Sequence, residues 1–401
     1  MRTSAKAHIA RAAEAILSGR PAAAQDMAAV YKSRIERLAA QMAHEGIFAA
    51  IFEDTEGRRS AHVRYLCGHP GDALLAVTAD GRSILCPWDV NLAAQHAHAG
   101  RIIASAKYDR DHIKAAKAIL KSLKPPRNQF NKVEVPPSTP YPLFLEYVDA
   151  LSGFEVRCTE RSIHDFVSTM RSIKDEYEIA CVRRAAQITC AITDEIESLL
   201  RGGKISTEAD VALLIERRLR ENGCERTGFD TLAAGPGRSF AIHAFPCYTD
   251  GPWGTQGLSI LDYGLVCGGY TSDATLTIAR GPLSAEQEEL LDLVEKAAGA
   301  GLGLYKKGVP LKDAAAAVDA IFSEKGRSMP HSLGHGIGLD IHEAPLVRTR
   351  AKTGQRFEPG MIVTLEPGLY DPALGGARLE NDVLITEDGS EPLTNSRIIR
   401  L

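Results

Sequence analysis

The sequence lacks any apolar run long enough to cross a membrane, and it lacks a strong excess of one charge. No segment approaches the roughly 18 consecutive apolar residues that a membrane span requires. The 401 residues include 47 basic and 51 acidic side chains, so the charge gives no attraction toward nucleic acid or an anionic lipid surface. We therefore expect neither a nucleic acid nor a membrane as a partner. A chain of this length predicts two domains with ample core.

Three sequence signals of other protein classes are also missing. Residues 1–27 are rich in alanine but lack the apolar core of about 7–15 residues that defines a secretory signal. The eight cysteines form no Cys-x-x-Cys pair, which favours reduced thiols in a cytoplasmic protein. Cys247 or Cys267 could be a catalytic nucleophile, but neither stands in a motif with a partner histidine. Residues 28–165 contain no glycine-rich phosphate loop, which argues against a nucleotide site.

Helical and strand-like patterns alternate in the first 165 residues and predict an α/β domain. Apolar positions at helical spacing that end at Gly46 predict a helix over 27–45. The segment Ala79–Arg82 separates two apolar runs and predicts a hairpin of strands 73–78 and 83–86. The other predicted elements are strands over 47–52, 133–135 and 154–156, and helices over 112–123 and 141–151.

The remainder of the chain predicts an α+β domain in which a pair of helices followed by strands occurs twice. Asp175 and Glu178 form a capping-box start for a helix that ends near Gly202. The predicted helices cover 175–200, 207–221, 284–305 and 311–325, and the predicted strands cover 231–234, 258–266, 274–278, 361–366 and 377–386. Such a repeat is typical of a domain with pseudo-twofold symmetry.

Four carboxylates and one imidazole stand in apolar or glycine-rich frames at spacings that suit a metal site. They are Asp262, Asp273, His335, Glu366 and Glu380. Singly, such residues are usually strand ends or loop positions, but carboxylates inside apolar strands are costly unless they are paired or bound to metal. An oxygen-rich set with one nitrogen favours Mn²⁺, Co²⁺, Fe²⁺ or Zn²⁺. Bridging carboxylates can hold two ions about 3.5–4 Å apart with a shared water nucleophile.

Glycines surround His335 at positions 334, 336 and 338. Because glycine has no Cβ, this segment can approach another backbone or a substrate closely. An alternative is a metal site made of three histidines, His331, His335 and His342. Their spacing brings them together only on a helix, and three glycines within eight residues disfavour a helix. One histidine as ligand, with the other two near it, is therefore the preferred interpretation.

The chain resembles the pita-bread metallopeptidase family, which includes aminopeptidase P, prolidase, methionine aminopeptidase and the metal-free relative creatinase. The resemblance is strong over residues 160–401 and rests on three segments, which are 331–345, 366–380 and 238–246. It implies a curved antiparallel sheet covered by helices over 166–401, a smaller creatinase-like α/β domain over 28–165, and an N-terminal extension over 1–27. Ala377, Leu379 and Asn381 depart from the family pattern, but no ligand position is lost.

The resemblance also implies a role for each site residue. The five residues of the metal set are the ligands, and Glu366 in addition serves as general base. His243 and His342 are catalytic residues that face the substrate and stabilise charge on the scissile carbonyl. His331 and Arg378 are further substrate-binding residues. Arg378 could pair with a ligand carboxylate, hold a substrate carboxylate or remain solvated, and Glu343 supports the site from behind.

The activity that the resemblance implies is cleavage of Xaa-Pro bonds in dipeptides or short peptides through a hydroxide that bridges two divalent ions. Mn²⁺ is the expected metal, with Co²⁺, Zn²⁺ or Fe²⁺ as alternatives, and the expected assembly is a cytoplasmic homodimer. An N-terminal domain over 28–160 disfavours methionine aminopeptidase. One rival is a creatinase-like or other small-molecule C–N hydrolase or lyase, and another is an inactive scaffold. Both should have lost ligand positions, and this sequence retains all five.

Overall fold

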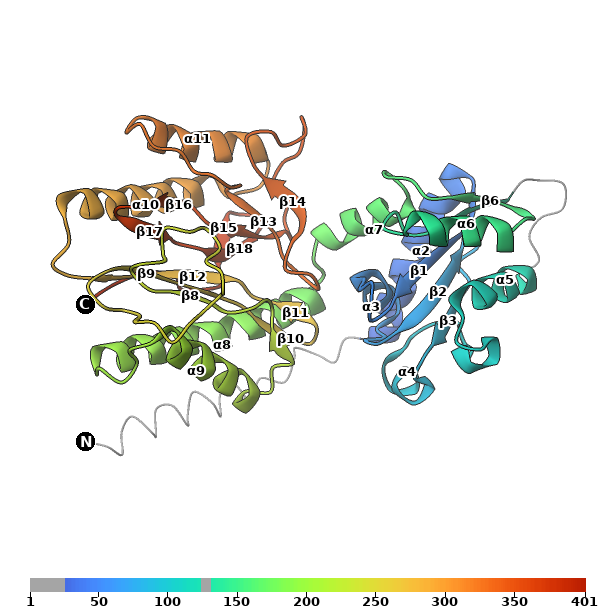
Figure 1. The fold of residues 1–401 in the computed structure, drawn as a ribbon. Coiled ribbons are helices and arrows are strands. Elements are labelled where there is room, and N and C mark those ends of the chain that lie inside the picture. Colours follow the sequence, from blue (N-terminus) through green and yellow to red (C-terminus); the bar gives the residue numbers. More distant parts are fainter. Residues whose placement is uncertain (1–25, 124–130) are drawn as a thin grey trace. The chain divides into compact units, whose positions relative to one another are not determined.

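The computed structural model describes residues 26–123 and 131–401. The chain divides into two compact units, Met1–Ile163 and His164–Leu401, which are described separately (Figure 1). The N-terminal extension predicted over 1–27 lies outside the described residues except for its last two positions. Within the described ranges, no helix is both long enough and apolar enough to cross a membrane.

The first unit is built on a six-stranded mixed sheet with the order β4-β3-β2-β1-β5-β6. β1 pairs antiparallel with β2 and parallel with β5, which places it at the centre of the sheet. The elements are α2 (Met27–Glu45), β1 (Ile47–Asp54), α3 (Ala61–Cys67), β2 (Ala73–Thr78), β3 (Ser83–Pro87), α4 (Val90–His96), β4 (Arg101–Ile102), the 3-10 helix η1 (Ser105–Tyr108), α5 (His112–Ser122), β5 (Asn131–Glu134), α6 (Tyr141–Ala150) and β6 (Phe154–Arg157).

Local sequence explains the boundaries of the first unit. Asp26 caps the start of α2 by accepting from two backbone N–H groups, and Gly46 ends the helix in the left-handed conformation. One face of the sheet packs on α5, whose Ile119 and Leu120 are fully buried beside Ile51 of β1. The helices and strands predicted for this unit are confirmed. The short helices α3 and α4 were not predicted, because seven residues are too few to show a helical period.

The second unit contains four small sheets and the longest helices of the chain. Its elements are α7 (Ile163–Ser172), α8 (Glu176–Arg201), α9 (Glu208–Glu221), β7 (Arg226–Thr227), β8 (Leu232–Ala234), β9 (Gly257–Tyr263), β10 (Leu265–Cys267), β11 (Tyr270–Thr271), β12 (Ala274–Arg280), α10 (Ala285–Leu304), α11 (Leu311–Ser323), β13 (Gly334–Gly336), β14 (Glu343–Val347), β15 (Ile362–Leu365), β16 (Gly368–Asp371), β17 (Gly375–Arg378), β18 (Asn381–Ile385), β19 (Ser390–Pro392) and β20 (Ile398–Arg400).

The predicted repeat of a helix pair followed by strands is confirmed. Helices α8 and α9 cover one side of the strands, and α10 and α11 cover the other (Figure 1). On the first side, buried residues of α8 such as Ile192 pack against Leu276 of β12. On the second, Val318 of α11 packs against Val363 of β15. Capping boxes begin α8, α9 and α10, so the helix starts are specified locally.

Two predicted strands are interrupted, and each interruption lies within two residues of a predicted metal ligand. The strand predicted over 258–266 breaks at Gly264, where a Cβ would lie 2.0 Å from the carbonyl oxygen of Ser272. The strand predicted over 377–386 breaks at residues 379–380, where the backbone N–H of Glu380 turns to donate to Thr275 at 3.2 Å. Continuous apolar patterns therefore concealed breaks that depend on contacts with distant strands.

Candidate metal centre and active site

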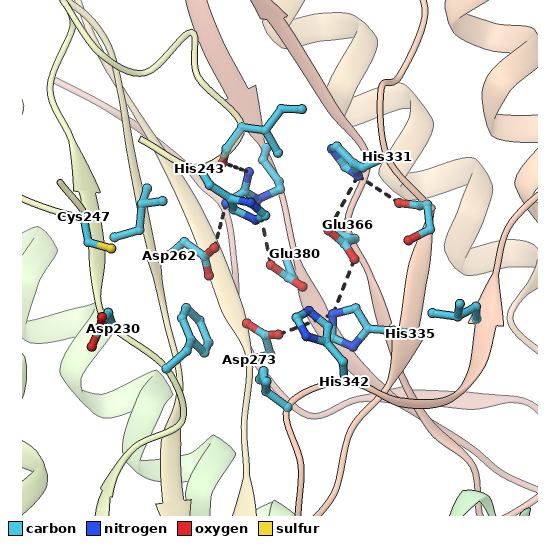
Figure 2. Close-up of a pocket in the computed structure, with 17 residues that line it drawn as sticks. Asp230, His243, Cys247, Asp262, Asp273, His331, His335, His342, Glu366 and Glu380 are labelled. Carbon is cyan, nitrogen blue, oxygen red and sulfur yellow. Dashed lines mark hydrogen bonds and ion pairs between the residues drawn. The ribbon is translucent and has the colours of Figure 1, made fainter. Parts of the chain in front are cut away.

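A pocket of about 420 Å³ opens among the strands of the second unit, and Figure 2 shows its lining. All residues that the sequence predicted for the site lie in this lining, although they come from segments up to 137 positions apart in the chain. They are His243, Asp262, Asp273, His331, His335, His342, Glu366, Arg378 and Glu380. The structure thus brings the whole predicted set together. The individual roles remain predictions.

Strand register places three of the carboxylates around one threonine. Thr275 of β12 lies opposite Asp262 of β9 in the antiparallel pair, and it forms a β-bridge with Glu380 on its other side. Asp273 stands two residues before Thr275, and side chains at this spacing in a strand share one face. All three carboxylates are nine-tenths or more buried. The sheet therefore gathers three buried acids at one point.

His335 reaches the same point from β13 because its neighbours are glycines. A Cβ at position 334 would lie 1.9 Å from the carbonyl oxygen of Thr364, and one at position 336 would lie 2.2 Å from that of Ala344. Only glycine allows the backbone to pass this close on both sides. The close approach predicted for this segment is confirmed, and the segment is a strand, as the argument against a helical three-histidine site required.

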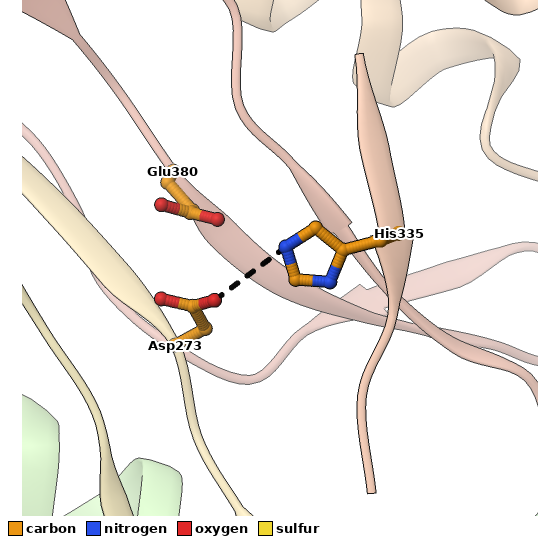
Figure 3. Close-up of side chains that lie close together, drawn as sticks. All are labelled: Asp273, His335 and Glu380. Atoms are coloured by element: carbon orange, nitrogen blue, oxygen red, sulfur yellow. Dashed lines mark ion pairs between the residues drawn. The ribbon is translucent and has the colours of Figure 1, made fainter. Parts of the chain in front are cut away.

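Asp273, His335 and Glu380 each offer a ligand atom, and these atoms all lie within 4.8 Å of one another (Figure 3). The Nδ1 of His335 lies 3.1 Å from the carbonyl oxygen of Gly336, so it carries the proton and donates it there. Nε2 is then an acceptor, and it faces Asp273 Oδ2 at 3.7 Å and Glu366 Oε1 at 3.5 Å. The lone pair of His335 Nε2 and these two carboxylate oxygens are the kinds of ligand that bind a divalent cation.

The electrostatics of these side chains fit a bound cation. Burial, together with the charge of Glu380, raises the pKa of Asp273 well above its usual range, and burial beside Asp262 raises the pKa of Glu380 to about 7. Burial lowers the pKa of His335 to about 4, so its imidazole is neutral. Oδ1 of Asp262 and Oδ1 of Asp273 are buried without a hydrogen-bond partner. Divalent ions would satisfy these oxygens and remove the repulsion.

A layer of polar groups behind the carboxylates orients them. The hydroxyl of Thr275 donates to Glu380 Oε2 at 2.7 Å. Asp382, which is fully buried, accepts from the backbone N–H of Asp273 at 2.9 Å. Such partners fix the rotamers of ligands in metal sites. Sequence analysis missed Asp382, although an acid inside the apolar run 383–385 carries the same signal that identified the other carboxylates.

Arg378 is almost completely buried, and its guanidinium ties the site together. It donates to Asp262 Oδ2 at 2.7 Å, to the Thr275 hydroxyl at 2.9 Å and to the Tyr370 hydroxyl at 2.6 Å. Of the alternatives left open for this residue, the structure contains the pairing with Asp262, a carboxylate of the predicted metal set, and surface solvation is wrong. Contact with a substrate stays a prediction. Tyr370 was named only as part of a motif, and its hydroxyl bond to Arg378 was not anticipated.

Three further histidines, His243, His331 and His342, border the pocket (Figure 2). The ring of His342 lies 4.4 Å from that of His335, and its pKa is lowered by burial. The Nε2 of His331 lies 3.1 Å from the Tyr370 hydroxyl, and burial lowers its pKa to about 4. Neutral imidazoles at neutral pH can donate an N–H to a substrate oxygen without adding a charge that would repel a metal ion.

Ion pairs and hydrogen bonds support the segments that carry His342 and His243. Glu343, next to His342, accepts from Arg171 of α7 and lies 3.4 Å from Lys174 Nζ, and the side chains of all three are at most 6% exposed. This agrees with the supporting role expected for Glu343. Arg171 was not anticipated, because its partner lies 172 residues away in the sequence.

The carboxylate of Glu208, the first residue of α9, binds both ends of the loop 235–249, and this loop carries His243. Its Oε1 accepts from the Gly235 N–H at 2.7 Å, and its Oε2 accepts from the N–H and hydroxyl of Thr249 at 2.7 and 2.6 Å. Arg238, inside the loop, also donates to Oε2. The Glu208 carboxylate is buried and fully occupied by this loop. The sequence analysis placed Glu208 only within the helix predicted over 207–221, and no local pattern distinguishes a loop anchor from an ordinary residue at a helix start.

Cys247 lines the pocket, but its chemistry does not suit a nucleophile. Burial raises the pKa of its thiol, whereas nucleophilic cysteines need a lowered pKa. Cys267 lies 3.2 Å, sulfur to sulfur, from Cys224, and it is not among the pocket residues. Neither cysteine therefore supports the thiol alternative.

Comparison with known proteins gives a consistent result for fold and family. Residues 180–387 match the model of metallopeptidase family M24, and residues 34–173 match that of the creatinase/prolidase N-terminal domain. An Xaa-Pro dipeptidase from Pyrococcus horikoshii is 35% identical over 239 residues, which cover 59% of this chain and 66% of the relative. The aligned part thus spans about two thirds of that relative's length.

Solved structures extend the similarity over nearly the whole chain. An Xaa-Pro dipeptidase from Bacillus anthracis superposes with a TM-score of 0.81 and 28% identity, covering 92% of this chain and 100% of its own. An X-Pro aminopeptidase from Thermotoga maritima gives a TM-score of 0.77 and 27% identity, covering 92% and 99%. The predicted α+β architecture, a pita-bread domain preceded by a creatinase-like α/β domain, is confirmed. The match over residues 180–387 takes in more than half of the chain and every residue of the predicted site, so this chain belongs to metallopeptidase family M24.

Proposed function

We propose that this chain is a metal-dependent peptidase that cleaves Xaa-Pro bonds in dipeptides or short peptides. The observation that carries the proposal is the buried cluster of Asp273, His335 and Glu380, whose ligand atoms lie within 4.8 Å of one another. Asp262 and Glu366 border the same pocket. The similar proteins named as Xaa-Pro dipeptidases and X-Pro aminopeptidase support the choice of substrate.

The proposed cofactors are two divalent ions, with Mn²⁺ expected and Co²⁺, Zn²⁺ or Fe²⁺ as alternatives. Asp262, Asp273, His335, Glu366 and Glu380 would hold them, and the unpartnered oxygens of Asp262 and Asp273 support this assignment. When bound, such ions polarise the scissile carbonyl as Lewis acids and lower the pKa of a water to near neutrality. Oxygen-rich coordination with one imidazole suits these borderline to hard ions.

The protein residues supply proton transfer, orientation and charge stabilisation. Glu366 borders the pocket next to His335, which supports its role as the base that takes the proton of the attacking water and returns it to the leaving imino nitrogen. His243 and His342 line the pocket and can each donate an N–H to the carbonyl oxygen as it gains charge. Arg378 neutralises and orients Asp262 at 2.7 Å.

Proline explains why this chemistry suits the site. It has no backbone N–H and fixes φ near about −65°, so peptidases that depend on that N–H discriminate against it. Carbonyl activation together with neutral imidazole donors does not require the missing hydrogen. The pocket volume of about 420 Å³ fits a short peptide segment.

The test compares substrates with a matched set of peptides. The Mn²⁺-loaded protein should hydrolyse Ala-Pro and Ala-Pro-Ala at least about tenfold faster in kcat/KM than the corresponding Ala-Ala peptides, a difference of about 1.4 kcal/mol. Acetylation of the substrate's amine should weaken cleavage, because a free amine can bind Asp230, an acid of the pocket that is not assigned to metal binding. Turnover of creatine or another guanidino C–N bond, without cleavage of any Xaa-Pro peptide, would favour the creatinase-like alternative.

The proposed assembly is a homodimer. On α6, Tyr141, Leu145 and Val148 are exposed at spacings of four and three residues, which aligns them on one helix face. An apolar face of this kind supports an interface made by the first unit. Sedimentation at micromolar concentration should give twice the chain mass, and a monomer would contradict the proposal. The cytoplasmic location stays a prediction.

A further inference from the structure

A second pocket of about 500 Å³ adjoins the active-site pocket. It lies between α11, the segment 329–333 and the chain that follows β14. His331, Ser332 and Leu346 line both pockets, so the two pockets share part of their walls. None of the residues assigned to metal binding belongs to the second pocket. A ligand that extends from the first pocket past His331 therefore enters the second.

The second pocket has the opposite charge to the first. Arg348 and Arg350 line it, and among the residues that the structure describes neither guanidinium makes an ion pair or a side-chain hydrogen bond. Asp319 is the one acidic residue in its lining, so two cations face a single anion. The pocket therefore carries one net positive charge and two unused bidentate donors.

The charges of the two pockets favour one orientation of a bound peptide. Asp230 of the first pocket, which is not assigned to metal binding, can attract a free amine, and Arg348 and Arg350 of the second pocket attract a free carboxylate. If the scissile carbonyl lies at the acidic cluster, proline occupies the region beside His331 and the residue after proline lies beyond it. The apolar lining from Met329 and Leu333 can accommodate that residue's side chain, and the arginines can bind its terminal carboxylate.

We propose that this pocket binds the residue after proline together with its terminal carboxylate, so that Xaa-Pro-Yaa tripeptides with a free carboxylate are the preferred substrates. The inference rests on the proposed Xaa-Pro peptidase function and specifies the substrate length for the same site. It assigns Arg348 and Arg350 as specificity residues. Dipeptides end before the pocket and do not use it.

The test measures kcat/KM of the Mn²⁺-loaded protein for Ala-Pro-Ala and for Ala-Pro-Ala amide. The free acid should be cleaved about tenfold faster, because the amide has no charge to meet the arginines. In the double variant Arg348→Gln/Arg350→Gln this ratio should fall to within about twofold of one. The matched control Lys352→Gln removes an exposed cation two residues beyond the pocket and should keep the wild-type ratio.

Each result is decisive. Equal cleavage of acid and amide by the wild-type protein would overturn the proposal, and so would a ratio that survives in the double variant. A ratio that also disappears in Lys352→Gln would show a general charge effect and would overturn the assignment to this pocket. Calorimetric titration with Pro-Ala and Pro-Ala amide separates the inference from the proposed function. Tighter binding of the acid that depends on both arginines would support the pocket even if no Xaa-Pro peptide is cleaved.

Discussion

Replacing Glu208 by glutamine should impair catalysis although Glu208 does not line the active-site pocket. Its carboxylate accepts four hydrogen bonds, from the Gly235 and Thr249 N–H groups, the Thr249 hydroxyl and Arg238. These bonds join the two ends of the loop that carries His243. We infer that Glu208 is a positioning residue, which acts through His243.

The size of the expected loss follows from the hydrogen bonds that glutamine cannot make. The amide is best placed with its oxygen at the Oε2 position, which keeps Thr249 and Arg238 bonded but turns an NH₂ toward the Gly235 N–H. The buried Gly235 N–H then lacks an acceptor and faces a second donor, at about 1–3 kcal/mol, and the Arg238 bond loses its charge assistance, at about 1 kcal/mol. The closed loop is thus destabilised by about 2–4 kcal/mol. We expect kcat/KM to fall about 10- to 100-fold, since small misplacements of catalytic groups have effects of this size.

The assay is a double-mutant cycle with kcat/KM for an Xaa-Pro peptide as readout. Removal of one carbonyl-stabilising donor costs about 10²–10³-fold, so His243→Ala sets the upper limit. Because Glu208 acts through His243, the double variant Glu208→Gln/His243→Ala should be no worse than His243→Ala alone. Hydrogen exchange should be faster across residues 235–249, and metal content should be unchanged. Glu216→Gln, at a half-exposed acid of the same helix that makes no contact with the loop, is the control.

Two outcomes would refute the reasoning. If Glu208→Gln leaves exchange in the loop 235–249 unchanged, the carboxylate does not hold the loop. If the double variant loses the product of the two single losses, the residues act independently and Glu208 contributes to stability or to another part of the site. A loss of metal in Glu208→Gln would likewise place the effect outside His243.

Three further predictions concern metal, ligands and pH. Dialysis against a chelator should lower kcat more than about 100-fold, and Mn²⁺ or Co²⁺ should restore it, because the metal is expected to supply several kcal/mol; full activity in metal-free protein contradicts this. Asp273→Ala and Glu380→Ala should reduce bound metal measured by elemental analysis, whereas His342→Ala should keep the metal and lose about 10²–10³-fold in kcat. In the first unit, burial raises the pKa of Glu53, but hydrogen bonds, first from His112, outweigh it and leave the pKa below its usual value. The stabilisation by the Glu53 carboxylate is therefore present above the pKa of the unfolded state and is lost as pH falls through the pKa of the folded state. In Glu53→Gln, the melting temperature should therefore fall less steeply with decreasing pH than in the wild-type protein, as measured by thermal unfolding.

The acids that line the site could be predicted from sequence because each of them carries a local signal. A carboxylate within an apolar strand, such as Asp262 beside Leu261, is costly to bury and therefore indicates a partner. The same test applied to residues 381–385 would have found Asp382. The glycines around His335 gave a second kind of local signal, a backbone that must pass close to another. Secondary-structure elements with clear caps and periods, such as α2 and α8, were predicted for the same reason.

The parts that could not be predicted depend on contacts between distant segments. Glu208 follows Thr207 in a sequence that also describes an ordinary helix start, and its role as loop anchor appears only when residues 27–41 positions away fold against it. Arg171 has no local feature that points to Glu343. Roles of this kind are carried by buried hydrogen bonds between elements, and a propensity or a spacing within one element contains no information about them.

Strand register sets the distances between the carboxylates of the proposed metal site. Thr275 is paired with Asp262 on one side and bridged to Glu380 on the other, and Asp273 shares its face. A slip of one residue in β12 would turn both Asp273 and Thr275 to the opposite face. The acids would then lose the ligand geometry and the hydroxyl of Thr275 together. A conservative change that keeps the register, such as Thr275→Val, should by contrast remove only the two bonds of the hydroxyl, at 2.7 Å to Glu380 Oε2 and at 2.9 Å from Arg378 Nε. The ligands therefore depend on the pairing of β9, β12 and the segment at 380 before they depend on any one side chain.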